Sequence, residues 1–240
     1  MPTLLCLLKP PDRGLPARRM SVPMWFSMLA LCYLAMQVAG LVVGLVRWHH
    51  LGLPERFAAL WFGVAAIAGI VEHVLRTTQH NSQLAAHLWF APSGVLALWI
   101  AAGVVTGRRA RALWRAAALA YLGVIAMVLA ITETPAEYSP YAGAIHGMVL
   151  VGVGAHSIVY RAGHAGVSLW RDASFLIGAG LLLIGGPTTF LALVSRTLGS
   201  TDGATVRVLY AMRLCLAVGG QGFILRGLLP MPRRGREHTQ

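Results

Sequence analysis

Seven runs of about 20 mostly apolar residues, each long enough to cross the hydrocarbon of a bilayer, constrain this chain more than any other feature. Inside lipid no water satisfies exposed backbone groups, so each span must be a helix or part of a closed barrel, and long unalternating runs indicate helices. The runs are Met24 to Val46, Phe57 to Arg76, Ala85 to Thr106, Ala112 to Ile131, Tyr141 to Tyr160, Ala173 to Val194 and Ala204 to Leu225. We therefore expect an all-α polytopic membrane protein, a seven-transmembrane helix bundle.

The composition agrees with a membrane protein and argues against a soluble domain, a nucleic-acid-binding protein and a retinal protein. Hydrophobic residues make up 57% of the chain and charged residues only 12%, which is far from the balance of a soluble domain. The net charge of +12 does not indicate a nucleic-acid partner, because the arginines follow the helix ends. Lys9 is the only lysine and lies outside every span, so the chain cannot form the Schiff base of a retinal protein. The expected partner is membrane lipid.

The arginines predict an orientation in a cell inner or plasma membrane. Short loops rich in Lys and Arg mark the cytoplasmic side. Most arginines lie at the ends of the spans on the face that receives the C-terminus, whereas the other face holds Arg76, Arg196 and Arg207 besides the N-terminal tail. We expect the N-terminus outside and the C-terminus in the cytoplasm, although the basic tail argues against it.

The division of the chain follows from these spans. Residues 1–23 are expected to form a disordered tail without the features of a signal peptide, and Met20 and Met24 are alternative starts. Residues 24–229 form the transmembrane domain, and residues 230–240 form a basic cytoplasmic tail.

Glu72 is the ionisable residue that marks a functional position, since a charge inside hydrocarbon is costly and is usually buried and paired. The residues that share its helix face include Trp61, Ala65 and Ala68, while the opposite stripe holds Ile67, Ile70 and Val74. We expect Glu72 to face the bundle interior. Arg213, well inside the last span, is the predicted partner, either in an ion pair or through a shared water network.

Several other polar residues are expected at the same level as Glu72. They are His73, His87 and His146, with Tyr210 on the stripe of Arg213. Together these six residues predict a polar, ligand-binding pocket in the outer half of the bundle. His146 could be a structural hydrogen-bond donor, a metal ligand, a haem ligand or a general base. No tight ligand spacing predicts a metal site, and the sequence assigns no cofactor.

Two stretches carry a family resemblance. Glu72 near a helix end, the polar loop Thr77 to Gln83, then Leu88, Trp89 and Pro92, and finally Gly107 and Arg108, resemble the seven-transmembrane sensor region of prokaryotic histidine kinases. The residues from Leu169 to Ala173, which lead into the sixth span, are similar to the corresponding segment of that family. No kinase domain follows Leu229, so the resemblance implies a stand-alone sensor that relays an outside or membrane-borne signal to a separate signalling partner.

Two other functions remain open. Small seven-helix membrane terpene cyclases are similar in size and use an acid near the end of the second helix, so Glu72 would be the general acid of an intramembrane enzyme on an isoprenoid or other apolar lipid. The second acid of that group is missing from the spans. Trp61, Trp99, Tyr121 and Tyr210 would then line a path for a cationic intermediate. The third function is an accessory subunit of a larger membrane complex.

Overall fold

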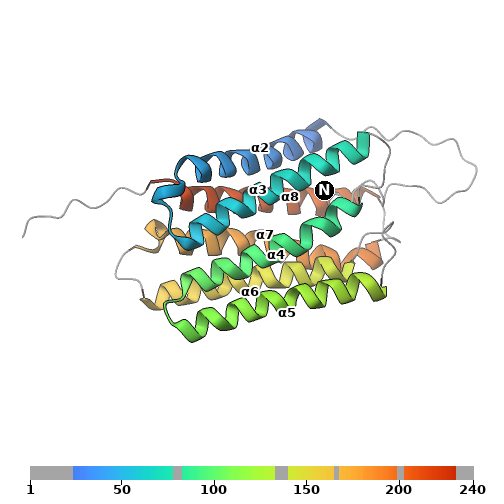
Figure 1. Ribbon diagram of the computed structural model, residues 1–240. Helices are drawn as coiled ribbons and strands as arrows, with labels where there is room; N and C mark the ends of the chain where they lie inside the picture. The colour runs from blue at the N-terminus through green and yellow to red at the C-terminus, as the bar shows by residue number, and fades with distance from the viewer. Residues whose placement is uncertain (1–23, 78–82, 133–139, 165–167, 199–202, 231–240) are drawn as a thin grey trace, which may run out of the picture.

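Seven α-helices and two short 3-10 helices make up the part of the chain that the computed structural model describes (Figure 1). That part comprises residues 24–77, 83–132, 140–164, 168–198 and 203–230. The helices are α2 (Met24–Val46), α3 (Leu53–Thr77), α4 (Gln83–Val104), α5 (Arg108–Thr132), α6 (Pro140–His164), α7 (Ala173–Leu198) and α8 (Gly203–Leu228), with η1 (Trp48–His50) before α3 and η2 (Leu169–Arg171) before α7. The predicted all-α seven-helix bundle is confirmed.

The observed helices are longer than most of the predicted spans. The bounds of α2 are those predicted, whereas α5 begins at Arg108 and α6 continues to His164, beyond the apolar residues. A helix satisfies its own backbone in water as well as in lipid, so it need not end where the hydrocarbon ends. The predicted N-terminal tail and residues 231–240 of the predicted C-terminal tail lie outside the described residues.

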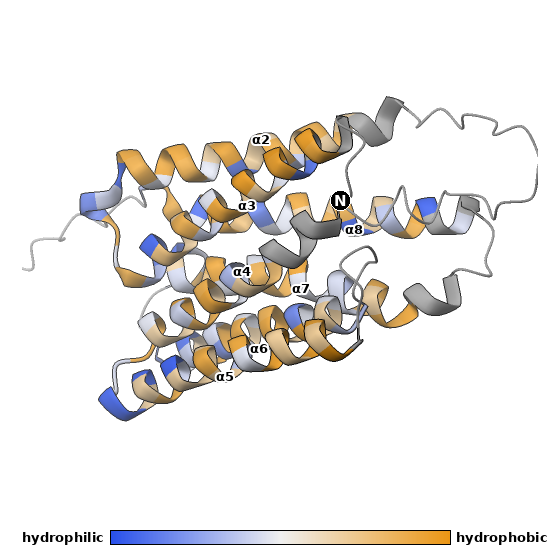
Figure 2. Ribbon diagram, turned by 45° about the vertical axis from the view of Figure 1, so that its right-hand side comes forward, coloured by the Kyte–Doolittle hydropathy of each residue, from blue (hydrophilic) through white to orange (hydrophobic). Residues whose placement is uncertain are grey.

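The chain is a multi-pass membrane protein by helix length and hydropathy. Six of the helices are long and apolar enough to cross a membrane, and α4 contributes a shorter apolar stretch, Trp89–Val104. Apolar side chains such as Leu119, Ile131 and Leu193 are exposed on the outside of the bundle, where a soluble protein would carry polar groups. Hydrophobic residues predominate along the helices (Figure 2). An exposed apolar surface of this extent is typical of helices that lie in lipid.

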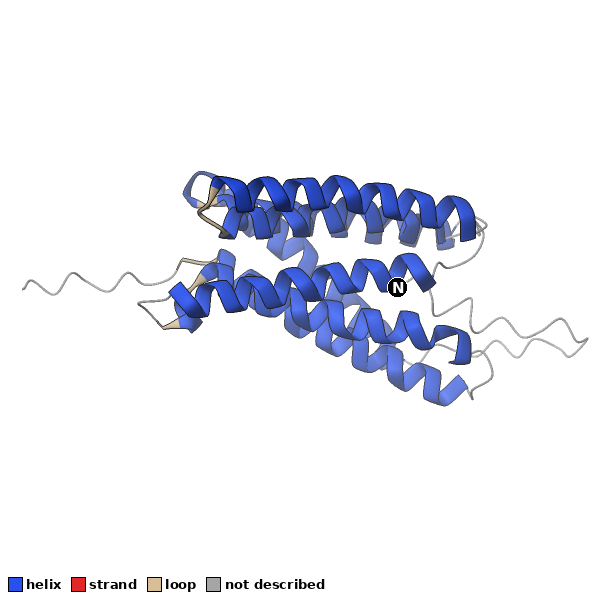
Figure 3. Cartoon of the chain, turned by 90° about the horizontal axis from the view of Figure 1, so that it is seen from below, coloured by secondary structure: helices blue, strands red, loops and turns tan. Residues whose placement is uncertain are grey.

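Consecutive α-helices run in opposite directions, and the six connections between them are short enough to keep neighbours antiparallel (Figures 1 and 3). Six helices form a ring in the order α2, α3, α4, α6, α7 and α8, and α2 closes the ring by packing on α8. Helix α5 lies outside this ring against α4 (Figure 1). Arginines gather where α2, α4, α6 and α8 end and where α3, α5 and α7 begin, which we call the arginine-rich end.

Small residues bring the helices of the ring into close contact. A Cβ atom added to Gly154 of α6 would lie 2.6 Å from the carbonyl oxygen of Gly178 on α7. A Cβ atom on Gly180 of α7 would lie 2.4 Å from the carbonyl oxygen of Gly220 on α8. Membrane helices associate through such close packing because lipid supplies no hydrophobic force between them.

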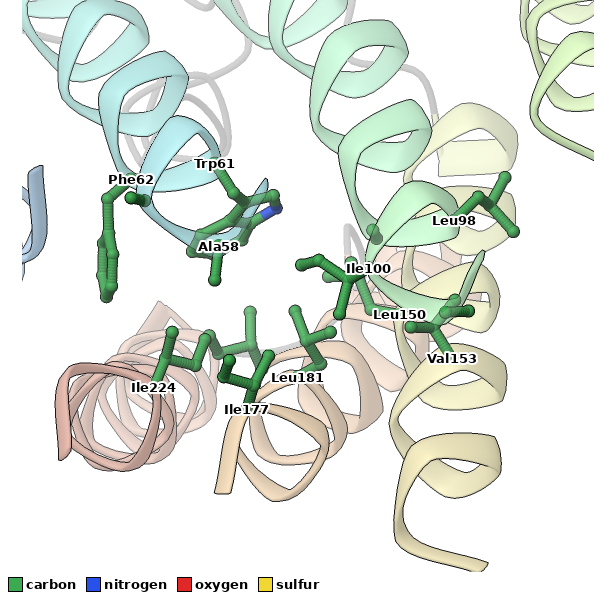
Figure 4. Packing of buried hydrophobic residues seen from close by; sticks show 14 of the residues in the cluster. Ala58, Trp61, Phe62, Leu98, Ile100, Leu150, Val153, Ile177, Leu181 and Ile224 are labelled. Atoms are coloured by element: carbon green, nitrogen blue, oxygen red, sulfur yellow. The ribbon is translucent and has the colours of Figure 1, made fainter. Parts of the chain in front are cut away.

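The centre of the ring is filled by apolar side chains from α3, α4, α6, α7 and α8. Trp61, Ile100, Leu181 and Ile224 converge there (Figure 4). The core therefore separates the polar residues near the arginine-rich end from those in the other half of the bundle.

Candidate functional site

Glu72 lies near the end of α3, in the half of the bundle opposite the arginine-rich end, and its side chain is 8% exposed. Trp61 and Ala65 on the same stripe are buried, whereas Ile67, Ile70 and Val74 are exposed. The predicted orientation of α3 is therefore correct: its small and polar face points inward and its branched aliphatic face points to lipid.

Two polar residues of α2 lie next to Glu72. Tyr33 is within hydrogen-bonding reach of Gln37 and close enough to Glu72 for a Coulombic interaction. The Gln37 side chain is buried, and its Oε1 atom would lie 3.5 Å from a Cβ atom on Gly69, one helical turn before Glu72. Sequence reasoning missed both residues, although a glutamine inside the apolar run of α2 was a signal for a polar contact.

Arg213 of α8 completes this set, which we call the Tyr33 group: Tyr33, Gln37, Glu72 and Arg213. Its side chain is half-buried. It lies close enough to Tyr33 and to His146 for its charge to act on both. A direct Glu72–Arg213 ion pair is not among the contacts of the described residues, and the two charges share Tyr33 as a neighbour. The predicted shared water network stays a prediction.

His146 of α6 lies in a second polar set, the His146 network, which joins α4, α5 and α6. The ring is 2% exposed. Its Nδ1 atom lies 3.2 Å from the Tyr121 hydroxyl and its Nε2 atom lies 3.4 Å from the Ser93 hydroxyl. The Tyr121 hydroxyl donates to the carbonyl oxygen of Phe90 at 2.7 Å, and the Ser93 hydroxyl donates to that of Trp89 at 2.7 Å.

The donors and acceptors of this network fix the tautomer of a neutral ring and leave one hydroxyl with two acceptors in reach. Because Tyr121 uses its single hydrogen on Phe90, it can only accept at His146, so Nδ1 carries the proton of the neutral ring and Nε2 is an acceptor. The Ser93 hydroxyl donates to the carbonyl oxygen of Trp89 and can rotate to donate to Nε2 instead. When Ser93 bonds to Trp89, Nε2 can accept from a donor of a ligand.

Local sequence shapes this network. A Cβ atom on Gly94 of α4 would lie 2.3 Å from the Tyr121 ring, so only glycine lets Tyr121 pass over α4 and reach Phe90. Aromatic rings pack around the network: Trp61 contacts Trp89 at a centroid distance of 5.4 Å, and Trp89 contacts His146 at 6.2 Å. Ser93 was missed as a site residue, because a serine in an apolar run is common. Tyr121 was predicted only as an aromatic side chain of the alternative isoprenoid path and not as a partner of His146.

The remaining predicted site residues divide into two sets. Tyr210 is buried on α8 and packs with Leu191 and Leu214, in a cluster to which Tyr33 also belongs. The side chains of His73 and His87 lie outside what the structure describes.

The two alternatives that the sequence left open, a metal site and an isoprenoid path, can be compared with these positions. No group of three His, Cys, Asp or Glu that could hold a metal occurs among the described residues. Of the aromatics proposed for an isoprenoid path, Trp61, Tyr121 and Tyr210 are buried, but Trp99 is exposed beside Arg115.

A different kind of polar contact occupies the arginine-rich end. Arg161 of α6 forms an ion pair with Asp172, in which Arg161 Nε donates to Asp172 Oδ2 at 2.8 Å. Asp172 also caps α7, since Oδ1 accepts from the backbone nitrogen of Phe175 at 2.9 Å. Glu55 of α3 lies within Coulombic reach of both residues and of Arg47, whose guanidinium donates to the carbonyl oxygen of Leu228. We call Arg47, Glu55, Arg161 and Asp172 the arginine-end cluster.

No protein family, curated protein or solved structure matches this chain.

Proposed function

We propose that this chain is a receptor-like membrane protein that binds a small ligand among the Tyr33 group and the His146 network and relays binding to a separate partner. The observation that carries this proposal is the position of Arg213. Arg213 of α8 lies within Coulombic reach of Tyr33 of α2 and of His146 of α6, which lie in different parts of the helix ring. A ligand held by Arg213 would therefore bind near three helices and could bias how they pack.

The chemistry of these residues favours a ligand with an anionic group. Arg213 is half-buried and makes no ion pair with another described residue. Tyr33 and His146, which lie within Coulombic reach of Arg213, add neutral donors that suit a carboxylate. The surrounding side chains, such as Leu191, Tyr210 and Leu214, suit a short apolar tail. The ligand class we propose is a small amphiphilic carboxylate.

The experiment uses three probes with the same tail and different head groups: hexanoate, hexanol and hexylamine. Thermal unfolding of the full chain, purified in a neutral detergent, is measured with each probe at equal concentration. A ligand that binds the folded state raises the melting temperature. We expect hexanoate to raise it most, and Arg213→Gln to remove the difference between hexanoate and hexanol.

The matched control is Arg207→Gln, because Arg207 is also a half-buried arginine of α8 but lies nearly two turns from Arg213. It should retain the response to hexanoate. Equal responses to all three probes, or an unchanged hexanoate response in Arg213→Gln, would rule out the proposed carboxylate site.

A further inference from the structure

A shallow groove of about 410 Å³ runs along the outside of α8 near the arginine-rich end. It is lined by Trp170 of η2, Leu176 of α7, and Gly219, Gly222, Phe223 and Arg226 of α8. The groove exists because two of the α8 residues lack side chains. A Cβ atom on Gly219 would meet nothing within 4 Å, and one on Gly222 would meet only the tip of Met36, at 3.8 Å.

This groove faces lipid for most of its length. The α8 residues that precede Gly219 on the same stripe, Met212 and Leu216, are exposed apolar side chains of a membrane-spanning helix. An apolar chain that occupied the groove could continue along them toward the middle of the bilayer. The occupant of such a surface is a lipid, because lipid is the medium that surrounds the helix.

The end of the groove has the chemistry of the interface between lipid and water. Arg226 is exposed in the last turn of α8, and Arg171 is exposed beside Trp170. Trp170 is 63% exposed and packs on Phe223 with a centroid distance of 6.1 Å. Tryptophan prefers the depth of the lipid head groups, where its ring is apolar and its N–H is wet. The Arg226 guanidinium, which lines the groove with Trp170 and Phe223, therefore lies at head-group depth.

We propose that this groove binds one anionic phospholipid, with its phosphate near Arg226 and an acyl chain over Gly219 and Gly222. Basic side chains at the membrane surface attract anionic lipids, and a guanidinium can donate two parallel hydrogen bonds to a phosphate. The groove lies away from the Tyr33 group and the His146 network, so this proposal does not depend on the proposed function.

Native mass spectrometry of the full chain in detergent tests this site with phosphatidylglycerol and phosphatidylcholine that carry identical acyl chains. We expect the first phosphatidylglycerol to bind about fivefold more tightly than phosphatidylcholine, the size expected for one arginine at an anionic surface. Arg226→Gln should abolish this preference. Gly219→Leu should fill the groove and weaken the binding of both lipids.

Two control variants change the same residue types elsewhere. Arg109→Gln removes an exposed arginine at the same end of the bundle but on α5, and Gly152→Leu adds a side chain in open space on α6. Both should bind lipid as the wild type does. Glycerol phosphate, added in excess, should not displace the bound phosphatidylglycerol.

Three results would overturn the proposal: equal affinity of the wild type for the two lipids, an unchanged preference in Arg226→Gln, or displacement of the lipid by glycerol phosphate. The last result would identify the site as one for free phosphate. If Gly219→Leu fails to elute as a folded protein, the lipid preference of Arg226→Gln still tests the proposal, because the Arg226 side chain is exposed and the fold does not need it.

Discussion

The arginine-end cluster and the His146 network are both polar sets in an apolar protein, yet they are built differently. In the arginine-end cluster, opposite charges pair at the ends of helices: Arg161 binds Asp172, and Asp172 caps α7. In the His146 network, neutral groups meet inside the bundle, and two hydroxyls bond to backbone carbonyls of α4. The first set fixes where helices begin and end, whereas the second has a hydroxyl, that of Ser93, with two acceptors in reach: the carbonyl oxygen of Trp89 and His146 Nε2.

This difference separates a contribution to stability from a contribution to function. A charge pair that also caps a helix stabilises the fold in every state of the protein. Hydrogen bonds between membrane helices contribute only about 0.6 kcal/mol on average, so the burial of His146, Tyr121 and Ser93 is not explained by stability alone. The arginine-end cluster therefore contributes to stability, whereas the His146 network has a part in ligand binding under the function that we propose.

The largest expected effect comes from distorting the His146 network through its neighbour. Gly94→Val places a Cβ atom 2.3 Å from the Tyr121 ring, which must move away from Phe90. Overpacking and the lost hydrogen bond together should lower the free energy of unfolding by about 3 kcal/mol. Unfolding in mixed micelles with increasing dodecyl sulfate measures this change.

Gly123→Ala is the control for this substitution, because a Cβ atom on Gly123 of α5 meets nothing within 4 Å. Gly123→Ala should leave the dodecyl sulfate concentration at the unfolding midpoint unchanged or raise it, since alanine favours a helix by up to about 1 kcal/mol over glycine. If Gly94→Val unfolds at the same denaturant concentration as the wild type, Tyr121 does not depend on the space at Gly94.

Much of this architecture follows from the sequence alone, and the reason is physical. A helix inside lipid must be about 20 residues long, so the seven spans and the inward face of Glu72 could be predicted. The contacts of His146 could not, because they depend on how far α5 lies from α4, which is set by Gly94 and by no periodicity within either helix. Asp172 likewise looks like an ordinary loop residue until Arg161 is placed beside it.

The second largest effect should come from the arginine-end cluster. Asp172→Ala removes both the ion pair with Arg161 and the cap of α7, and we expect a loss of about 2 kcal/mol in the free energy of unfolding, about half from each. The contribution of the ion pair to the free energy of unfolding is small, because the Arg161 side chain is 33% exposed and water screens its charge. The same denaturant titration measures the loss.

Asp172→Asn distinguishes the two contributions, since asparagine caps a helix as well as aspartate does but carries no charge. It should lose only about half as much stability as Asp172→Ala. Equal losses in the two variants would mean that the cap contributes nothing, and the arginine-end cluster would then be an ion pair only.

A smaller effect on stability is expected from His146→Leu. This substitution is the most direct test of the difference between the His146 network and the arginine-end cluster. Tyr121 keeps Phe90 as its acceptor and Ser93 keeps Trp89, so no buried donor loses its partner. The free energy of unfolding should fall by less than about 1 kcal/mol. The rise in melting temperature with hexanoate should nevertheless decrease, because a polar side chain within Coulombic reach of Arg213 has been removed.

His156→Leu is the matched control on the same helix, because His156 packs on Trp114 and lies outside the His146 network. It should keep the hexanoate response of the wild type. A loss of several kcal/mol in His146→Leu with an unchanged hexanoate response would reverse the roles that we assign to the two polar sets.

The smallest effect is the response to salt, and it tests the comparison without changing any residue of the His146 network. The Debye length falls from about 10 Å at 0.1 M salt to about 3 Å at 1 M, so partly exposed charges are screened and buried neutral groups are not. The difference in stability between the wild type and Asp172→Asn should therefore shrink by a few tenths of a kcal/mol, roughly, over this range. The difference between the wild type and His146→Leu, measured in the same buffers, should stay constant, because no charge of the network is lost with the imidazole. A salt-dependent difference in His146→Leu would instead mean that His146 is held as a cation in the folded protein. The network would then belong with the charged contacts of the arginine-rich end.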